Sequence, residues 1–232
     1  LAGGGHPSPA DTTSHGAYLL NTADTIGIPR TDAGVCNDRT DMLNADTIVF
    51  YASNPAWSAA GTPSYHYIRA KEAGVKFITV DPIYTASAQM LDAEWIPIRT
   101  GTDTAFLLGV ASEMIRLDKA EGDIVDWEFL DKYTVGFDAD HKPEDLKEDV
   151  NFADYLEGKY DGVKHDAEWA SAICGVPVEK ITWFAREIGK KKNVWLLHNF
   201  AAARCDACEN IPQLFMTLGA MGGHMGKPGN CT

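Results

Sequence analysis

The chain has 232 residues, of which 45% are hydrophobic and 23% are charged, close to the average of a soluble globular protein. This composition excludes a largely disordered chain, and the length suffices for one large domain or for one domain with part of another. A formal net charge of -13 would repel phosphates and anionic lipids, so no nucleic acid partner is expected. No apolar run approaches the roughly 20 residues that span a bilayer, so no direct membrane insertion is expected.

Residues 1–42 are rich in Gly, Pro, Thr and Asp and show no sustained hydrophobic period. This pattern predicts loops, with a short helix near Ala17 to Leu20. The chain begins with Leu1 and has neither a basic nor an apolar leader. We therefore expect that an N-terminal part is missing or that the chain was cut from a longer one, and the compartment cannot be read from this end.

Three short apolar runs, Thr47 to Ala52, Lys76 to Val80 and Glu94 to Ile98, each end in small, polar or acidic residues. This is the pattern of buried parallel strands. Predicted helices at Ser64 to Gly74 and Thr85 to Leu91 connect them, so we expect parallel strands with right-handed crossovers. Ligands of open α/β sheets bind at the carboxyl ends of strands, and the three loops therefore predict one binding edge.

The helical period places Tyr65, Ile68, Ala70 and Ala73 on one face of the first helix. The strongest helix runs from Thr104 to about Arg116, capped by Thr102 or Asp103, with Phe106, Leu107, Val110, Ala111, Met114 and Ile115 toward the sheet. Later elements are a helix around Trp127 to Leu130, a solvated excursion at Asp138 to Asp145, helices at Asp166 to Ile173 and Pro177 to Ile188, a strand at Asn193 to His198, a helix from about Cys208 to Ala220, and a flexible run from Met221 to Asn230.

The predicted fold is therefore α/β, a parallel-sheet dinucleotide-binding (Rossmann-like) domain over residues 43–232 with helices on both faces. Its binding edge offers carboxylates at Asp81 and Asp103, a polar turn at Ser53 and Asn54, and a helix N-terminus after Gly101. A carboxylate can accept two N–H bonds from a guanine-like edge, and a helix N-terminus attracts phosphate.

The alternative is that these residues are ordinary turn and N-cap residues. No glycine-rich dinucleotide fingerprint or Walker loop follows the first strand, which disfavours a standard NAD, FAD or ATP site. Cys205 and Cys208 form a lone C-x-x-C pair. A zinc or cluster site would need a second pair at matching spacing, so a redox or accidental pair is favoured.

Several ordered motifs suggest a family: Asn54-Pro55 after the first strand, Val80 to Thr85, Asp92 to Asp103, Phe129 to Asp138, Arg204 with Glu209, and Gly226 to Gly229. Together they resemble the catalytic subunits of molybdenum bis-guanine-dinucleotide oxidoreductases, especially the dimethyl sulfoxide reductase branch. The resemblance covers nearly the whole chain.

The resemblance implies an internal piece of a larger enzyme that binds molybdenum bis(molybdopterin guanine dinucleotide). Residues 1–42 would then be an end piece of a neighbouring domain, and residues 43–232 would hold one pterin guanine dinucleotide. The implied partners are the missing N-terminal domain, which can carry an iron-sulfur cluster, the missing C-terminal domain, an iron-sulfur electron-transfer subunit, and a small-molecule oxide substrate. The implied location is a bacterial periplasmic or membrane-associated complex, with the cytoplasm as an alternative.

Carried over by motif, the resemblance implies cofactor contacts at three loops: Ser53, Asn54 and Pro55; Asp81 and Pro82 for the guanosine; and Arg99, Gly101, Thr102 and Asp103. Ile83 stands where the family usually has arginine, and Thr100 where it usually has proline. Arg204 fits the family pattern of a catalytic residue facing the substrate or pterin better than His198 does.

The family's metal ligand in this branch is a serine shortly after a Gly-Gly segment. Counting from Gly3-Gly4 indicates Thr13, whereas counting back from Val49 indicates Ser14. Either hydroxyl could bind a hard, high-valent metal through oxygen. The alternative is that both are turn residues of a Thr/Ser-rich loop.

The resemblance implies that the parent enzyme reduces S-oxide or N-oxide acceptors by oxygen-atom transfer, and that the chain alone is inactive. A second hypothesis within the family is another substrate, such as a hydroxylated aromatic compound. A hypothesis of a different class is a non-catalytic nucleotide-binding or assembly module.

Overall fold

The computed structural model of the protein describes residues 25, 37–58, 61–141, 150–199, 201–202 and 210–232. The helix expected near Ala17 to Leu20 and the Cys205 and Cys208 pair lie outside these residues. Within the described ranges, no helix combines the length and the hydrophobicity that crossing a membrane requires.

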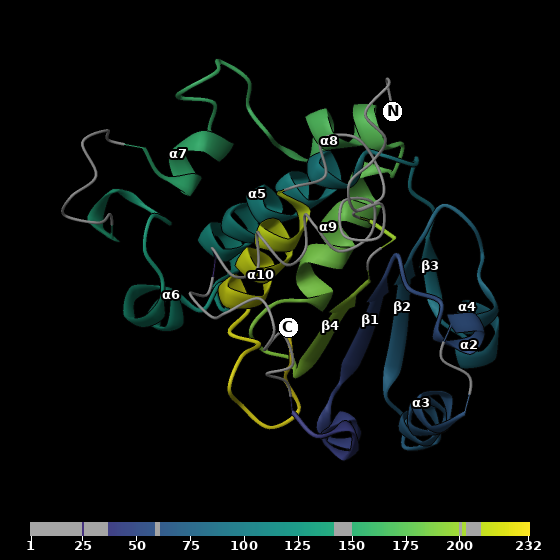
Figure 1. The fold of residues 1–232 in the computed structure, drawn as a ribbon. Helices are drawn as coiled ribbons and strands as arrows, with labels where there is room; N and C mark the ends of the chain where they lie inside the picture. The colour runs from purple at the N-terminus through teal and green to yellow at the C-terminus, as the bar shows by residue number, and fades with distance from the viewer. Residues whose placement is uncertain (1–24, 26–36, 59–60, 142–149, 200, 203–209) are drawn as a thin grey trace, which may run out of the picture.

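The described strands form one parallel sheet in the order β3-β2-β1-β4 (Figure 1). The strands are β1 (Thr47–Tyr51), β2 (Lys76–Val80), β3 (Glu94–Ile96) and β4 (Val194–His198). The predicted α/β fold with a parallel sheet is confirmed. In the register of the sheet Tyr51 lies beside both Val80 and His198, and Val80 lies beside Ile96, so the carboxyl ends of all four strands are level.

Helices pack on both faces of the sheet, as predicted (Figure 1). Alternate strand residues point to opposite faces, so that Val49 and Tyr51 enter one core while Ile48 and Phe50 enter the other. The first core contains residues of α5 (Asp103–Glu121), α8 (Ala167–Cys174), α9 (Val178–Glu187) and α10 (Ile211–Met221), and the second contains residues of α3 (Thr62–Glu72) and α4 (Ala86–Leu91). The shorter helices are η2 (Arg39–Asn44), α2 (Pro55–Ser58), α6 (Trp127–Tyr133), η3 (Ala139–His141) and α7 (Phe152–Leu156).

The long helix α5 lies across the first core and is longer than predicted. All six residues that the sequence placed on its apolar face are buried. The helix continues to Glu121 and ends at Gly122, whose φ of 74° suits glycine. It also buries Glu113, whose carboxylate accepts bonds of 2.8 and 2.9 Å from Arg116 and one of 2.9 Å from the Thr182 hydroxyl. These bonds offset the free-energy cost of burying the Glu113 carboxylate in the core.

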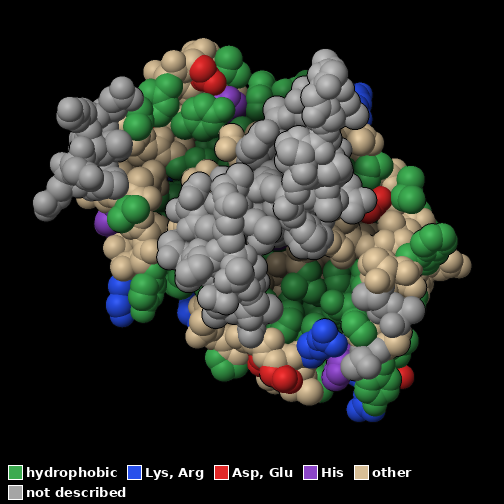
Figure 2. All heavy atoms as spheres, viewed as in Figure 1, with side chains coloured by type: hydrophobic (Ala, Val, Ile, Leu, Met, Phe, Trp, Pro, Cys, Tyr) green, Lys and Arg blue, Asp and Glu red, His purple; other side chains and the backbone are tan. Residues whose placement is uncertain are grey.

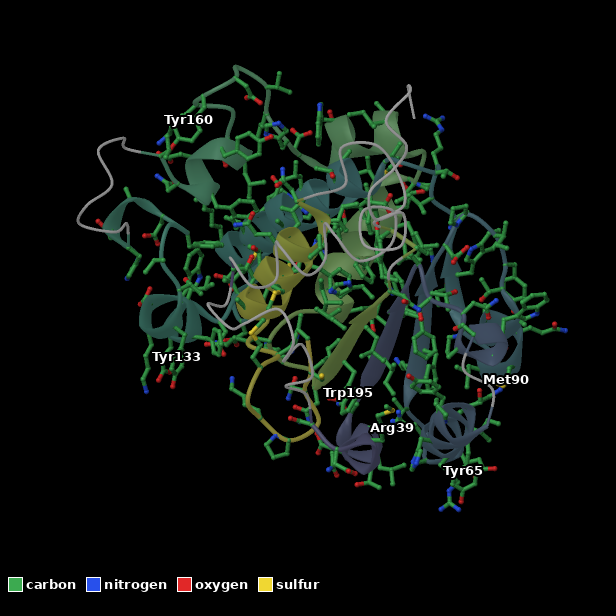
Figure 3. The ribbon with its side chains drawn as sticks, viewed as in Figure 1. Arg39, Tyr65, Met90, Tyr133, Tyr160 and Trp195 are labelled. Carbon is green, nitrogen blue, oxygen red and sulfur yellow. The ribbon has the colours of Figure 1, made fainter. Side chains whose placement is uncertain are left out.

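The predicted apolar face of α3 is wrong for Tyr65, Ile68 and Ala73, which are exposed, and right for Ala70, which is fully buried. Tyr65 is 56% exposed and Ile68 is 38% exposed, and Figure 3 shows Tyr65 on the side of α3 that points away from the sheet. The buried side is formed by Ala70 and the half-buried Tyr67, whose ring lies 4.8 Å from the Phe50 ring. A helix with so few apolar residues supports more than one helical stripe, and the contact between Tyr67 and Phe50 turns the stripe through Tyr67 and Ala70 toward the sheet.

The predicted flexible run at Met221 to Asn230 is also wrong. His224 and Asn230 are buried, and the following residue, Cys231, extends the edge of β4. Its amide donates to Val194 O at 3.1 Å, and its carbonyl accepts from Leu196 N at 2.7 Å. The glycines suggested flexibility, but long-range hydrogen bonds fix the segment.

Candidate functional site

Three loops leave the sheet at the same edge, because the strand ends are level. They comprise residues 52–54 after β1, residues 81–85 after β2 and residues 97–102 after β3. The predicted common edge is confirmed as geometry. Whether a ligand binds there stays a prediction.

The loop after β1 begins with an unusual backbone conformation at Ala52. Its φ of 49° lies in the left-handed region, which costs a non-glycine residue roughly 1 to 2 kcal/mol. The Ala52 amide donates to Val80 O at 2.9 Å, which holds the turn against β2. The chain then passes through half-buried Ser53 and Asn54 into buried Pro55, the first residue of α2. The Asn54 side chain contacts α4, because its Oδ1 accepts bonds of 2.7 and 3.1 Å from Ser87.

Asp81 follows β2 and is half-buried. Burial raises the pKa of its carboxyl, the amide of Ile83 opposes that rise by donating to Oδ1 at 3.1 Å, and the charge of Asp103 adds to it. Its backbone carbonyl accepts from Trp95 Nε1 at 2.8 Å, whereas neighbouring Pro82 is exposed. Asp81 is thus a half-buried acceptor directly after the end of β2.

Asp103 is the first residue of α5 and is only 9% exposed. Burial raises the pKa of its carboxyl, and a hydrogen bond of 2.9 Å from the phenol of Tyr51 opposes the rise. Because the charge of Asp103 influences Asp81, the two predicted carboxylates share one electrostatic environment. Asp103 differs from Asp81 in that it faces the core.

The loop after β3 is held mostly by bonds within the protein. Arg99 Nη1 donates to the carbonyls of Ala172 and Ile173 at 3.1 Å each, and so it binds the C-terminal end of α8. The Thr102 hydroxyl donates to Arg99 O at 2.7 Å rather than capping α5, and Gly101 provides a φ of 77°. Cofactor roles for Arg99, Gly101 and Thr102 stay predictions beside these structural roles.

The remaining predicted residues, Thr13, Ser14 and Arg204, lie outside the described residues. Within the part of the chain that the structure describes, no three His, Cys, Asp or Glu side chains are grouped to hold a metal ion. Two residues of this edge were not predicted from the sequence. Tyr51 donates a hydrogen bond to Asp103, and Ser87 donates one to Asn54. A polar residue within an apolar strand was the signal available for Tyr51, whereas Ser87 carried no signal.

A cavity with a volume of about 1040 Å³ lies between α5, α6 and α10. Its wall includes Phe129, Tyr133, Phe137, Met216 and Lys227. Tyr133 lies on α6, away from the sheet (Figure 3), and hydrophobic side chains reach the surface at several places on the face in Figure 2. This cavity is separate from the loops that carry Asp81.

The sequence matches a known family along most of its length. The model of the family described as "Molybdopterin oxidoreductase" matches residues 4–216. The chain is 34% identical to trimethylamine-N-oxide reductase of Haemophilus influenzae, over 81% of this chain and 22% of that protein. It is 33% identical to dimethyl sulfoxide reductase DmsA of the same organism, over 94% of this chain and 28% of that protein. It is 32% identical to biotin sulfoxide reductase of Cereibacter sphaeroides, over 97% of this chain and 29% of that protein.

A solved structure shares the fold. Acetylene hydratase from Pelobacter acetylenicus superposes with a TM-score of 0.59 over 89% of this chain and 25% of that chain, at 18% sequence identity. This likeness shows a common fold only. The chain spans less than a third of the length of each of the proteins compared above.

Proposed function

The chain belongs to the molybdopterin oxidoreductase family. We therefore propose that the edge formed by the loops after β1, β2 and β3 binds one half of the family's pterin cofactor. That half is one guanine dinucleotide of molybdenum bis(molybdopterin guanine dinucleotide). The observation that carries the proposal is that Asp81 directly follows β2 and that Asp103 accepts a hydrogen bond from Tyr51, the last residue of β1, so both carboxylates lie at the carboxyl end of the sheet, where each was predicted to contact the cofactor. A parallel sheet binds ligands at this end.

The residues at this edge fit such a nucleotide. Asp81 accepts one backbone bond at Oδ1, so it retains acceptor capacity for the adjacent N–H groups of a guanine. Asn54 keeps its side-chain NH₂ beside the same edge, since only its oxygen is bound to Ser87. When bound, molybdenum would supply two-electron oxygen-atom transfer, and the hydroxyl of Ser14 or Thr13 would supply a protein ligand. Arg204 would face the substrate.

We further propose that the chain is part of a larger enzyme that reduces S-oxide or N-oxide acceptors. The support is its similarity to reductases of such compounds and the small share of their length that it spans. The remainder would include another cofactor-binding domain and an N-terminal domain with an iron-sulfur cluster, and an iron-sulfur subunit would supply electrons. The chain alone would then be inactive, and turnover of dimethyl sulfoxide by it would disprove this part of the proposal.

A nucleotide titration tests the proposed binding edge. Calorimetry with guanosine diphosphate and adenosine diphosphate should show tighter binding of the guanine nucleotide. Asp81→Asn should lower the affinity for the guanine nucleotide roughly 10-fold or more, because the two carboxylate oxygens that accept from adjacent N–H groups of guanine are lost. Asp92→Asn is the matched control, since it removes an exposed carboxylate at the end of α4. Equal binding of the two nucleotides would instead favour a nucleotide-binding module without the proposed specificity.

A further inference from the structure

Ser87 links the loop after β1 to the first turn of α4. Its side chain is fully buried, and its hydroxyl donates to Asn54 Oδ1 at 2.7 Å. Its own amide donates to the same oxygen at 3.1 Å, and the hydroxyl also accepts from the amide of Ala56 at 3.0 Å. The three bonds join residues more than 30 positions apart in the sequence.

These contacts determine which way the Asn54 amide points. A backbone N–H can only donate, so the atom facing the Ser87 amide must be the oxygen of Asn54. The Asn54 NH₂ group therefore points away from α4, and none of the described residues accepts a hydrogen bond from it. Asn54 is half-buried at the carboxyl end of β1, beside the proposed nucleotide edge.

We propose that Ser87 is a positioning residue that presents Asn54 as a hydrogen-bond donor to an acceptor oxygen of the bound nucleotide. This inference rests on the proposed function and adds the polarity of the contact. Rotating the amide would break the bond from the Ser87 backbone N–H, which can only donate, and would place the NH₂ group against that N–H, so the donor orientation is fixed before the ligand arrives. A contact prepared in this way costs no reorganisation on binding.

The first test is Asn54→Asp, which keeps the oxygen that Ser87 binds and replaces the donor with an acceptor. The melting temperature should stay at the wild-type value, while the affinity for guanosine diphosphate should fall about 10-fold or more. Gln89→Glu is the matched control, because it makes the same change of charge on an exposed residue of α4. It should leave both quantities unchanged.

A double-mutant cycle separates positioning from general stability. Ser87→Ala should lower the affinity for guanosine diphosphate roughly three- to tenfold in the wild-type background, because one of the two bonds that hold the oxygen is lost. In the Asn54→Asp background it should change the affinity less than about twofold, because the donor is already absent. A structural role alone would give the same loss in both backgrounds.

The outcomes distinguish the two proposals. If wild type binds guanosine diphosphate and Asn54→Asp binds it equally well, the positioning role is wrong while the proposed function stands. Additive losses in the cycle would lead to the same conclusion about Ser87. If wild type shows no binding of guanosine diphosphate, the proposed function fails and the inference fails with it. Should Ser87→Ala not fold, Asn54→Asp with its control still decides the polarity of the contact.

Discussion

The phenol of Tyr51 donates a hydrogen bond of 2.9 Å to Asp103 Oδ1. This bond joins the last residue of β1 to the first residue of α5, with Tyr51 completely buried and Asp103 9% exposed. Burial raises the pKa of the Asp103 carboxyl, and the phenol partly offsets that effect by stabilising the ionised form. A charged group is thereby held at the sheet edge by a residue of the core.

Tyr51→Phe should destabilise the fold at pH 7 by about 1 to 3 kcal/mol, because it removes the donor and keeps the ring. It should also raise the pKa of Asp103 further. A raised folded-state pKa means that the native state binds the proton more tightly, so stability falls as pH rises through that pKa. The penalty should therefore shrink at lower pH, where the carboxyl becomes protonated. Urea unfolding at several pH values measures the effect.

Tyr133→Phe is the control for this substitution, since it removes a phenol that is 63% exposed on α6. Its stability should stay within about 0.5 kcal/mol of wild type. An unchanged stability of Tyr51→Phe at every pH would show that the buried bond contributes nothing.

The strands could be predicted from the sequence because their signals are local, and the ends of β1, β2 and β4 were predicted to within one residue, whereas β3 ends at Ile96 rather than at the predicted Ile98. Apolar runs such as Thr47 to Tyr51 are buried throughout, and the polar residue that ends a run marks the sheet edge. This is why Asp81 and Asp103 were placed at one edge correctly. The side-chain network around them was not predictable, because the partners of Asn54 and Asp103 are set by tertiary packing across more than 30 residues.

Errors arose where long-range contacts override composition. The glycine-rich run after Met221 shows no hydrophobic period, yet His224 and Asn230 are buried beside β4. Similarly, the face of α3 is chosen by Phe50 rather than by the pattern of α3 itself. Neither contact leaves a signal in the local sequence.

Asn230→Ala should destabilise the protein by about 2 to 4 kcal/mol, because the side chain satisfies buried groups on both sides. Its Oδ1 accepts from Val194 N at 3.0 Å, and its NH₂ group donates to Asn193 Oδ1 at 3.0 Å. Asn210→Ala is the control, since Asn210 is exposed and its side chain makes no cap bond to α10. Chemical denaturation compares the two, and equal effects would contradict a fixed C-terminal segment.

His141 should make the segment after α6 sensitive to pH. Asp138 Oδ1 lies 2.7 Å from His141 Nδ1, and this bond raises the pKa of the imidazole above 6.5. The protonated ring therefore adds stability at low pH, and that contribution is lost as pH rises through the raised pKa. An NMR titration of the ring should show that Asp138→Asn lowers its pKa. Asp140→Asn removes a more weakly acting charge and should cause a smaller shift.

Arg99→Ala should release the C-terminal end of α8. The guanidinium donates to two carbonyls there, and cations at helix C-termini are stabilising, so we expect a loss of roughly 1 kcal/mol for this exposed residue. Gly175 supports the arrangement, because a Cβ at that position would lie 3.0 Å from Arg99 Nε. Arg69→Ala is the control, since its 3.7 Å pair with Glu72 is exposed and contributes little.

Measuring guanosine diphosphate affinity on the same variants separates the two roles of Arg99. If the guanidinium only stabilises the end of α8, Arg99→Ala should be less stable than wild type but should bind guanosine diphosphate as tightly as Arg69→Ala does. A further loss of affinity beyond that control would reveal a direct cofactor contact. If Arg99→Ala is as stable as wild type, the helix-capping role is contradicted, because loss of the two bonds to the α8 carbonyls should lower the free energy of unfolding. The carbonyls of α8 hold Arg99 at the end of β3, so both roles are compatible with one position of the side chain.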